Sequence, residues 1–179
     1  MHFLDTPLKD VRIIEAEPIE DERGYFCRSW CSQELADAGL DDRLSQCNIS
    51  FNRKRGTVRG MHFQTPPYEE TKIVRCTRGK MFDVIVDIRP ESDEYLQWAG
   101  FRLNQDVLRF LYIPPGYAHG FQTLSDDCEV FYQMSVPYHP DRSTGFHWQD
   151  PQVGICWPIA DDIVISDRDR ELPLLEARQ

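Results

Sequence analysis

Turn-forming residues recur at short intervals along this 179-residue chain and leave little room between them for long helices. Gly24, Gly56 and Gly116 interrupt the sequence, as do the proline pairs at 66–67 and 114–115. The segments between them are short and rich in β-branched and aromatic residues; the clearest are 72–76, 81–88, 107–113 and 128–134. Many short strands separated by evenly spaced turns are typical of sandwiches and closed barrels. The sequence therefore predicts an all-β chain, and a jelly roll fits the spacing best.

Helical signals are few. Ser32 is a candidate N-cap for a short helix over residues 32–38, and Gly39 follows where such a helix would end. A second short helix is expected near Ser166. Residues 148–179 are less regular, and we expect them to pack over one end of the β structure. The length suits one domain, so residues 1–179 are predicted to form a single unit.

Composition and charge exclude several classes of protein. No run of about 20 apolar residues is present, so a transmembrane helix is not expected. The first residues have neither a basic region nor an apolar region typical of a signal peptide, which predicts a cytoplasmic protein. Its six cysteines are then expected to be ordinary thiols. A net charge of −10 argues against nucleic acid or an anionic membrane as partner, and it makes any cluster of arginines and lysines informative.

Two of the five histidines have informative neighbours. His62 lies in the segment Arg-Gly-Met-His-Phe-Gln at 59–64, where a strand would place His62 and Gln64 on one face. His119 follows the turn Pro-Pro-Gly at 114–116, at the start of a candidate strand. For His62 alone, a core histidine with a single hydrogen bond is an equally good interpretation. Tyr132, taken alone, is typical of a core aromatic residue.

Taken together, the motifs resemble the family of dTDP-4-dehydrorhamnose 3,5-epimerases, the RmlC-type cupins. The resemblance extends from about residue 18 to residue 173. The matching segments are 21–26, 46–50, 59–64, 72–75, 82–89, 113–121, 148–151 and 155–158. Each segment is weak alone, but all of them occur in order at the usual spacing. The resemblance implies a cupin-type jelly roll, a homodimer, and an isomerase that epimerises a nucleotide-diphosphate sugar.

The resemblance also implies the roles of particular residues. His62 matches the catalytic base, Asp169 its carboxylate partner, Tyr132 the general acid, and Lys72 the lysine beside the ketone oxygen. The substrate-binding positions are Arg23, Gln46, Asn48, Arg59, His119, Tyr138 and Arg168. Of these, Gln46 and Asn48 match nucleotide contacts, and Tyr138 matches a tyrosine that stacks on the base. Three positions depart from the family pattern: Arg28 and Ser143, where the family usually has glutamate, and Cys47, where it usually has aspartate.

These residue types suit proton transfer at carbon. A carbon acid beside a ketone needs a base whose pKa is near neutrality, which a histidine provides. A cation at the ketone oxygen stabilises the enolate, and an acid on the opposite face completes the inversion. Arginines suit a diphosphate, because their planar forks bind phosphate oxygens in pairs. No electrons are transferred, so the sequence predicts no redox cofactor. The resemblance implies that the substrate is a dTDP-linked 4-keto-6-deoxyhexose of rhamnose-type biosynthesis.

Three alternatives stay open. A relative that inverts only one carbon, or acts on a different nucleotide sugar, has the same residues. A metal-dependent cupin oxygenase or isomerase would need a second histidine where Gln64 stands, and His62, His119 and an uncertain Glu69 or Glu70 make a poor ligand set. No metal is therefore expected. A non-catalytic sugar-binding jelly roll would not need the base, acid and lysine together.

Overall fold

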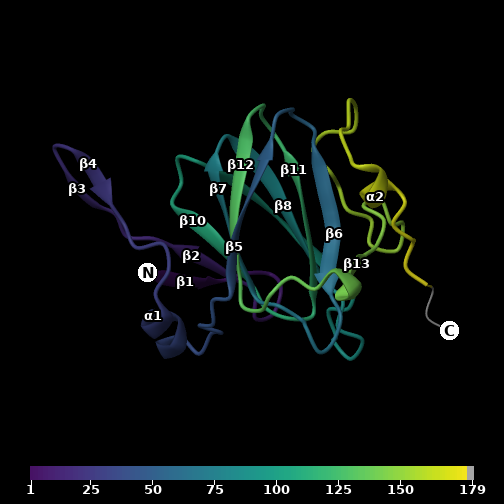
Figure 1. The fold of residues 1–179 in the computed structure, drawn as a ribbon, viewed down its shortest axis with the longest axis horizontal. Helices are drawn as coiled ribbons and strands as arrows, with labels where there is room; N and C mark the ends of the chain where they lie inside the picture. The colour runs from purple at the N-terminus through teal and green to yellow at the C-terminus, as the bar shows by residue number, and fades with distance from the viewer. Residues whose placement is uncertain (177–179) are drawn as a thin grey trace.

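The computed structural model describes residues 1–176, and all but two of its strands form two antiparallel β-sheets packed face to face (Figure 1). The six-stranded sheet has the order β1 (His2–Asp5), β2 (Arg12–Glu15), β10 (Arg109–Ile113), β7 (Lys72–Arg78), β12 (Cys128–Met134) and β5 (Gln46–Asn52). The five-stranded sheet has the order β13 (Ser143–Gly145), β6 (Val58–Gln64), β11 (Tyr117–Thr123), β8 (Lys80–Asp87) and β9 (Trp98–Asn104). The prediction of an all-β sandwich is confirmed.

The two-residue period of the strands separates an inner face from an outer face. The core between the sheets includes Val74 and Val130 from one sheet and Met81, Ile85 and Phe121 from the other. The same alternation places four polar side chains on the inner face: Lys72, Tyr132, Asp83 and His119. Apolar side chains thus fill one part of the space between the sheets, while polar side chains gather in another part.

Two short α-helices and one 3₁₀ turn lie within the described residues: α1 (Ser32–Asp37), η1 (Pro140–Arg142) and α2 (Asp167–Arg170). Both α-helices were predicted, but the N-cap of α1 was wrong. Cys31 occupies that position without a side-chain cap, because the Leu35 amide bonds to the Cys31 carbonyl and makes Ser32 the first helical residue. The α2 prediction is confirmed, with Ser166 accepting a hydrogen bond from the Asp169 amide.

The C-terminal segment covers the outer face of the five-stranded sheet. Phe146 and Val153 join Val84 and Val86 of β8 in a second apolar cluster, against which Trp157 also packs. The tail was expected over one end of the β structure; it packs instead on the outer face of this sheet, because the apolar side chains of β8 that point outward need cover. Residues 177–179 lie outside the described residues. No helix within residues 1–176 is long and apolar enough to cross a membrane.

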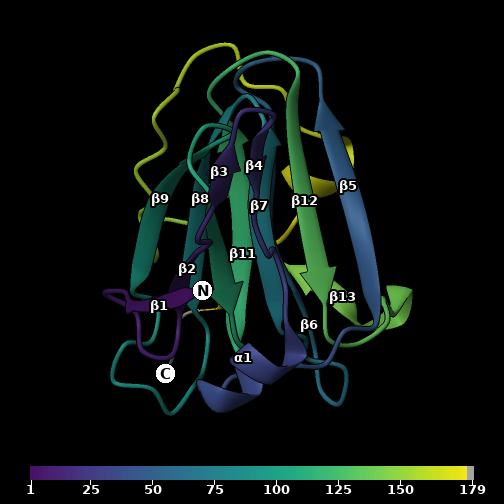
Figure 2. The same ribbon diagram turned by 90° about the vertical axis from the view of Figure 1, so that its left-hand side faces the viewer.

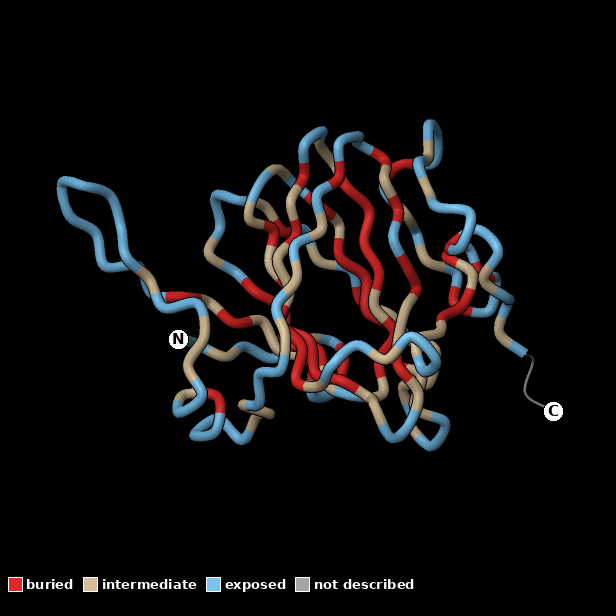
Figure 3. Tube along the Cα trace, in the orientation of Figure 1, coloured by how far each residue is buried: buried red, intermediate tan, exposed pale blue. Residues whose placement is uncertain are grey.

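A hairpin of β3 (Ile19–Asp21) and β4 (Gly24–Phe26) extends away from the sandwich. Figure 1 shows it projecting beyond the edge of the body, and Figure 2 shows it in front of the sheets, with α1 at the lower end. All eight of its residues, 19–26, are exposed, in contrast to the buried strands at the centre of the molecule (Figure 3). We refer to this hairpin as the arm.

Candidate active site

A cavity of about 500 Å³ lies between the two sheets. Its volume is in the range of small-molecule sites, about 300–1,000 Å³. Strands β5, β7 and β12 supply one wall, and β6 and β11 supply the other. The predicted site residues that line it are Gln46, Asn48, Arg59, His62, Lys72, His119, Tyr132, Tyr138 and Arg168.

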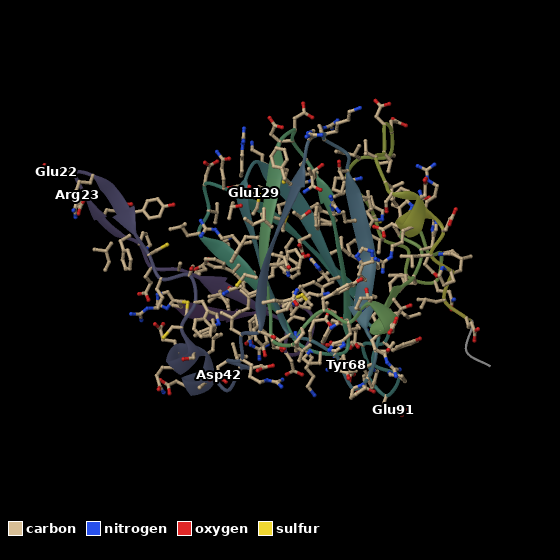
Figure 4. All side chains as sticks on the ribbon, viewed as in Figure 1. Glu22, Arg23, Asp42, Tyr68, Glu91 and Glu129 are labelled. Carbon is tan, nitrogen blue, oxygen red and sulfur yellow. The ribbon has the colours of Figure 1, made fainter. Side chains whose placement is uncertain are left out.

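Two of the predicted site residues do not line the cavity. Asp169 stands directly behind His62, as described below. Arg23 lies at the tip of the arm, far from the cavity of its own chain, as Figure 4 shows. Its side chain is 84% exposed and pairs with Asp21. The single chain therefore brings together every predicted site residue except Arg23.

His62 and Asp169 form a hydrogen-bonded pair. His62 Nε2 lies 2.8 Å from Asp169 Oδ1, and the Gly60 amide donates to Asp169 Oδ2 at 3.1 Å. Burial acts to raise the pKa of Asp169. The hydrogen bonds with the His62 ring and the Gly60 amide act in the opposite direction and outweigh burial, so the pKa is lowered overall. Asp169 is therefore a carboxylate that accepts the proton of His62 Nε2. This arrangement leaves Nδ1 of the same ring as the basic nitrogen.

Gly60 is required for this geometry. Its φ is +129°, and a Cβ at this position would lie 2.6 Å from the Gly120 Cα on the adjacent strand. Glycine alone combines this backbone conformation with so close an approach. The pairing of β6 with β11 is irregular beside it, between His119 and Phe121. Beside this irregularity the Gly60 amide donates to Asp169 of α2.

A second histidine–carboxylate pair stands on the neighbouring strand. His119 and His62 are register partners on β11 and β6, so both rings face the cavity. His119 Nε2 lies 2.9 Å from Asp83 Oδ2. Asp83 is fully buried, which raises its pKa, while His119 acts to lower it. The sequence analysis missed Asp83, although an acidic residue in the apolar run 81–86 indicates a buried carboxylate that needs a partner.

Lys72 is paired with a residue that the sequence analysis also missed in this role. Its Nζ lies 2.8 Å from Glu70 Oε1, and both side chains are nearly buried at the cavity wall. Glu70 was considered only as an uncertain metal ligand. The ion pair instead holds the lysine ammonium at the wall of the cavity.

Tyr132 faces the two histidines from the opposite sheet. Its strand, β12, belongs to the six-stranded sheet, whereas β6 and β11 belong to the five-stranded sheet. Burial raises the pKa of the Tyr132 phenol, and Arg59 nearby acts to lower it. Arg59 is itself oriented by Asn52, whose Oδ1 accepts from Arg59 Nε at 2.7 Å. The phenol is thus protonated at neutral pH.

Tyr138, Arg168 and Ser143 lie together on the cavity wall. Arg168 donates to Ser143 Oγ at 3.3 Å. Ser143 and Arg168 lower the pKa of the Tyr138 phenol through hydrogen bonds. Gln46 accepts the Tyr138 amide proton at 2.7 Å and donates to Asn48 at 3.2 Å. A cationic and aromatic end of the cavity thus adjoins the end that holds the histidines.

The match to a family model decides the family. The model of dTDP-4-dehydrorhamnose 3,5-epimerase matches residues 5–177. The chain belongs to this epimerase family. A dTDP-4-dehydrorhamnose 3,5-epimerase of Methanothermobacter thermautotrophicus is 44% identical over 94% of this chain and 91% of its own length.

Solved structures of epimerases agree with this assignment. The Bacillus anthracis dTDP-4-dehydrorhamnose 3,5-epimerase, solved with TDP and PPi bound, is 37% identical and superposes with a TM-score of 0.93 over 97% of this chain and 99% of that one. A 3'-monoepimerase from Streptomyces bikiniensis, in complex with dTDP-quinovose, is 31% identical with a TM-score of 0.86 over 97% and 87% of the two chains. The same fold therefore carries epimerases with different outcomes.

The three departures from the epimerase pattern have different surroundings. Ser143 lines the cavity and contacts Arg168. Cys47 is exposed on β5 and points away from the inner face. Arg28 precedes α1 and pairs with Glu34, outside the cavity of its own chain. Only the change at Ser143 alters the wall of this epimerase's cavity within a single subunit.

A metal site is not formed by the residues that the structure describes. Within residues 1–176, no three His, Cys, Asp or Glu side chains form a group that could hold a metal ion. His62 and His119 each direct Nε2 to a carboxylate instead. At position 64, where a metal-binding cupin would need a histidine, this epimerase has a glutamine whose amide is bonded to backbone groups.

Proposed function

We propose that this chain inverts carbon 3, carbon 5 or both in a dTDP-linked 4-keto-6-deoxyhexose, by removing a proton beside the ketone and returning one to the opposite face. The observation that carries the proposal is the placement of His62 and Tyr132 on facing sheets around one cavity. A sugar ring between them meets a base on one side and an acid on the other. The relatives' names and bound ligands support the same substrate class.

His62 is proposed as the base. With Nε2 committed to the Asp169 carboxylate, Nδ1 is available to take the proton. The same carboxylate favours the imidazolium that forms, as in other carboxylate–histidine pairs. Asp169 stays ionised because its pKa is lowered.

Lys72 is proposed to stabilise the enolate oxygen. An ammonium fixed at the cavity wall by Glu70 supplies positive charge where negative charge develops, without reorganisation during the reaction. Tyr132 then donates its proton to the other face of the carbon. The raised pKa of this phenol keeps it protonated until the enolate requires the proton. Proton removal and return leave the oxidation state of the sugar unchanged, so this chemistry requires no redox cofactor.

The nucleotide diphosphate is proposed to occupy the end of the cavity at Tyr138. Arg59 and Arg168 are suited to phosphate oxygens, and the Tyr138 ring offers a stacking surface to the base. Because Ser143 stands where the family usually has glutamate, the base is the part of the substrate most open to change. A comparison of dTDP, UDP, CDP and GDP binding identifies it.

We also propose a homodimer in which the arm reaches the partner subunit. Ile19 and Phe26 on the arm are 70% and 71% exposed, and Ile49 on β5 is 65% exposed. Strand β5 is an edge of the six-stranded sheet, so its outer backbone groups are available for pairing. An exchanged arm covers these apolar surfaces and carries Arg23 towards the partner's cavity. The six free thiols support a reducing, cytoplasmic location for the dimer.

The proposed reaction is tested by incubating the enzyme with dTDP-4-keto-6-deoxyglucose in D₂O. We expect deuterium to enter carbons 3 and 5, with inversion detected by NMR of the product. Deuterium at one carbon alone would assign the chain to the single-carbon epimerases, a class represented among the solved structures that it resembles. Binding without any exchange would identify a sugar-binding protein and contradict the proposal.

Replacing Asp169 with asparagine is expected to lower kcat by about 10²-fold, at the lower end of the range for the loss of general base catalysis. Asparagine keeps the shape of the side chain but loses the charge that fixes the His62 tautomer. The neighbouring Asp167→Asn serves as a matched control, since Asp167 lies on the same helix and does not line the cavity. Steady-state kinetics decide the matter: equal rates for the two variants would rule out a role for Asp169.

A further inference from the structure

Gln64 is a buried glutamine whose amide is fully used. It lies at the end of β6, two residues beyond His62 and on the same face, and it is 5% exposed. Its Oε1 accepts the His139 amide proton at 2.7 Å. Its Nε2 donates to the Tyr68 carbonyl at 2.9 Å and, at 3.4 Å, to the Pro137 carbonyl. One side chain therefore joins two loops that are far apart in the sequence.

These bonds converge on the backbone of Tyr138. Gln64 holds the carbonyl before Tyr138 and the amide after it, while Gln46 accepts the Tyr138 amide proton itself at 2.7 Å. Tyr68 also contacts this loop, because its ring lies against that of His139 with the centroids 3.6 Å apart and the planes tilted by 33°. Figure 4 shows Tyr68 at the lower end of the sandwich, where β6 ends.

The Tyr138 side chain, in contrast, is 44% exposed and is not embedded in the core. Core packing therefore contributes little to its orientation. Hydrogen bonds to Ser143 and Arg168 hold the phenol, and the bonds made by the backbone of residues 137–139 hold the point from which the side chain starts. Each such bond contributes about 0.5–1.5 kcal/mol, and leaving a buried donor without a partner costs more. The glutamines at 46 and 64 are the side chains that supply these bonds within the described residues.

We propose that Gln64 is a positioning residue for nucleotide binding: it holds the backbone of residues 137–139 so that the Tyr138 ring stands ready at the cavity. This inference rests on the proposed function, in which Tyr138 meets the nucleotide base. Strand β6 then has two roles: it carries the proposed catalytic base, His62, and it carries Gln64, which holds the loop of residues 137–139. Gln64 also lines the cavity, but its amide is bonded to the backbone of the two loops, so it acts on the nucleotide base through Tyr138.

Gln64→Met tests the clamp, because methionine has a similar length and lacks the amide. Gln122→Met is a matched control: Gln122 is also buried, and its amide exchanges two 2.9 Å hydrogen bonds with the backbone of Ile159, away from the cavity. In the ligand-free protein, Gln64→Met should speed hydrogen exchange at the amides of Tyr138 and His139 by about tenfold or more. A tenfold change corresponds to a loss of roughly 1.4 kcal/mol, which is about the contribution of one hydrogen bond. Gln122→Met should speed exchange at Ile159 and leave His139 unchanged. Unchanged exchange at His139 in Gln64→Met overturns the proposal.

Binding of two probes then separates positioning from general damage. Titration calorimetry should give a dTDP dissociation constant about tenfold higher in Gln64→Met and unchanged in Gln122→Met. Inorganic pyrophosphate, which has no base, should bind both variants as it binds the wild type. Equal losses for dTDP and pyrophosphate, or no loss for dTDP, overturn the assignment. If the wild type does not bind dTDP, the proposed function fails instead, and the exchange rates still decide whether Gln64 clamps the loop.

Discussion

Replacing His62 with alanine is expected to stop deuterium incorporation from D₂O at every carbon of the sugar. The proton must leave before either carbon can be inverted. Among the described residues, the other histidine that lines the cavity and pairs with a carboxylate is His119, which lies on the adjacent strand β11. Loss of a general base typically costs 10²–10⁴-fold, and we expect a value at the upper end. The rate is measured by NMR of the substrate under single-turnover conditions.

The fold is expected to survive this change. The His62 side chain is 33% exposed, and Asp169 keeps its bond to the Gly60 amide. His62→Asn is a second variant that also leaves a polar partner for Asp169. His147→Ala is the control, because His147 does not line the cavity. Deuterium uptake at the wild-type rate in a folded His62→Ala protein would assign the base to another residue, and His119 would be the first to examine.

Much of the fold could be predicted because its determinants are local. The run 128–134 became β12 with the same bounds, since its alternation of side chains reflects one buried face and one partly exposed face. The strand predicted at 107–113 begins two residues later in the structure, at Arg109. The reason is that the amides of Asp106 and Val107 bond to the Asn104 side chain in a turn. That side-chain contact is specific to the folded loop and leaves no periodic signal.

The site was predicted less completely, because its remaining parts depend on contacts between distant segments. Asp83 lies 36 positions before its partner His119, and neither local sequence pattern specifies the other. Glu70 is close to Lys72 in sequence, but the ion pair exists because both side chains turn inward beside the cavity. Gln64 could be placed on the face of His62, whereas the loops that it joins could not be anticipated.

Arg23 shows another reason why the site could not be predicted completely from the sequence. The sequence resemblance assigns it to the substrate, yet a single subunit holds it at the tip of the arm, paired with Asp21. The proposed exchange of arms would complete the site from two subunits, and the contacts of one subunit cannot specify such a site. The placement of Arg23 stays a prediction, tied to the proposed exchange of arms.

Replacing Tyr132 with phenylalanine is expected to separate the two halves of the reaction. The variant keeps His62 and Lys72, so proton removal and reversible return from the same face continue, and deuterium still enters the first carbon. Inversion requires a proton from the opposite sheet, and without the phenol it should fall by about 10²–10⁴-fold. Product configuration and isotope content are read from the same NMR spectra, which gives both rates in one experiment.

Tyr112→Phe controls for the loss of a buried phenol. Tyr112 lies on β10 of the same sheet, its hydroxyl accepts the Asp41 amide proton at 3.0 Å, and it does not line the cavity. This variant should retain inversion even if its stability falls. An equal loss of exchange and inversion in Tyr132→Phe would mean that the phenol acts before the enolate forms, for example by orienting the sugar, and the acid would then have to be sought elsewhere. Exchange that persists while inversion stops requires two separate proton-transfer groups on opposite faces of the ring, which is the arrangement that the two facing sheets provide.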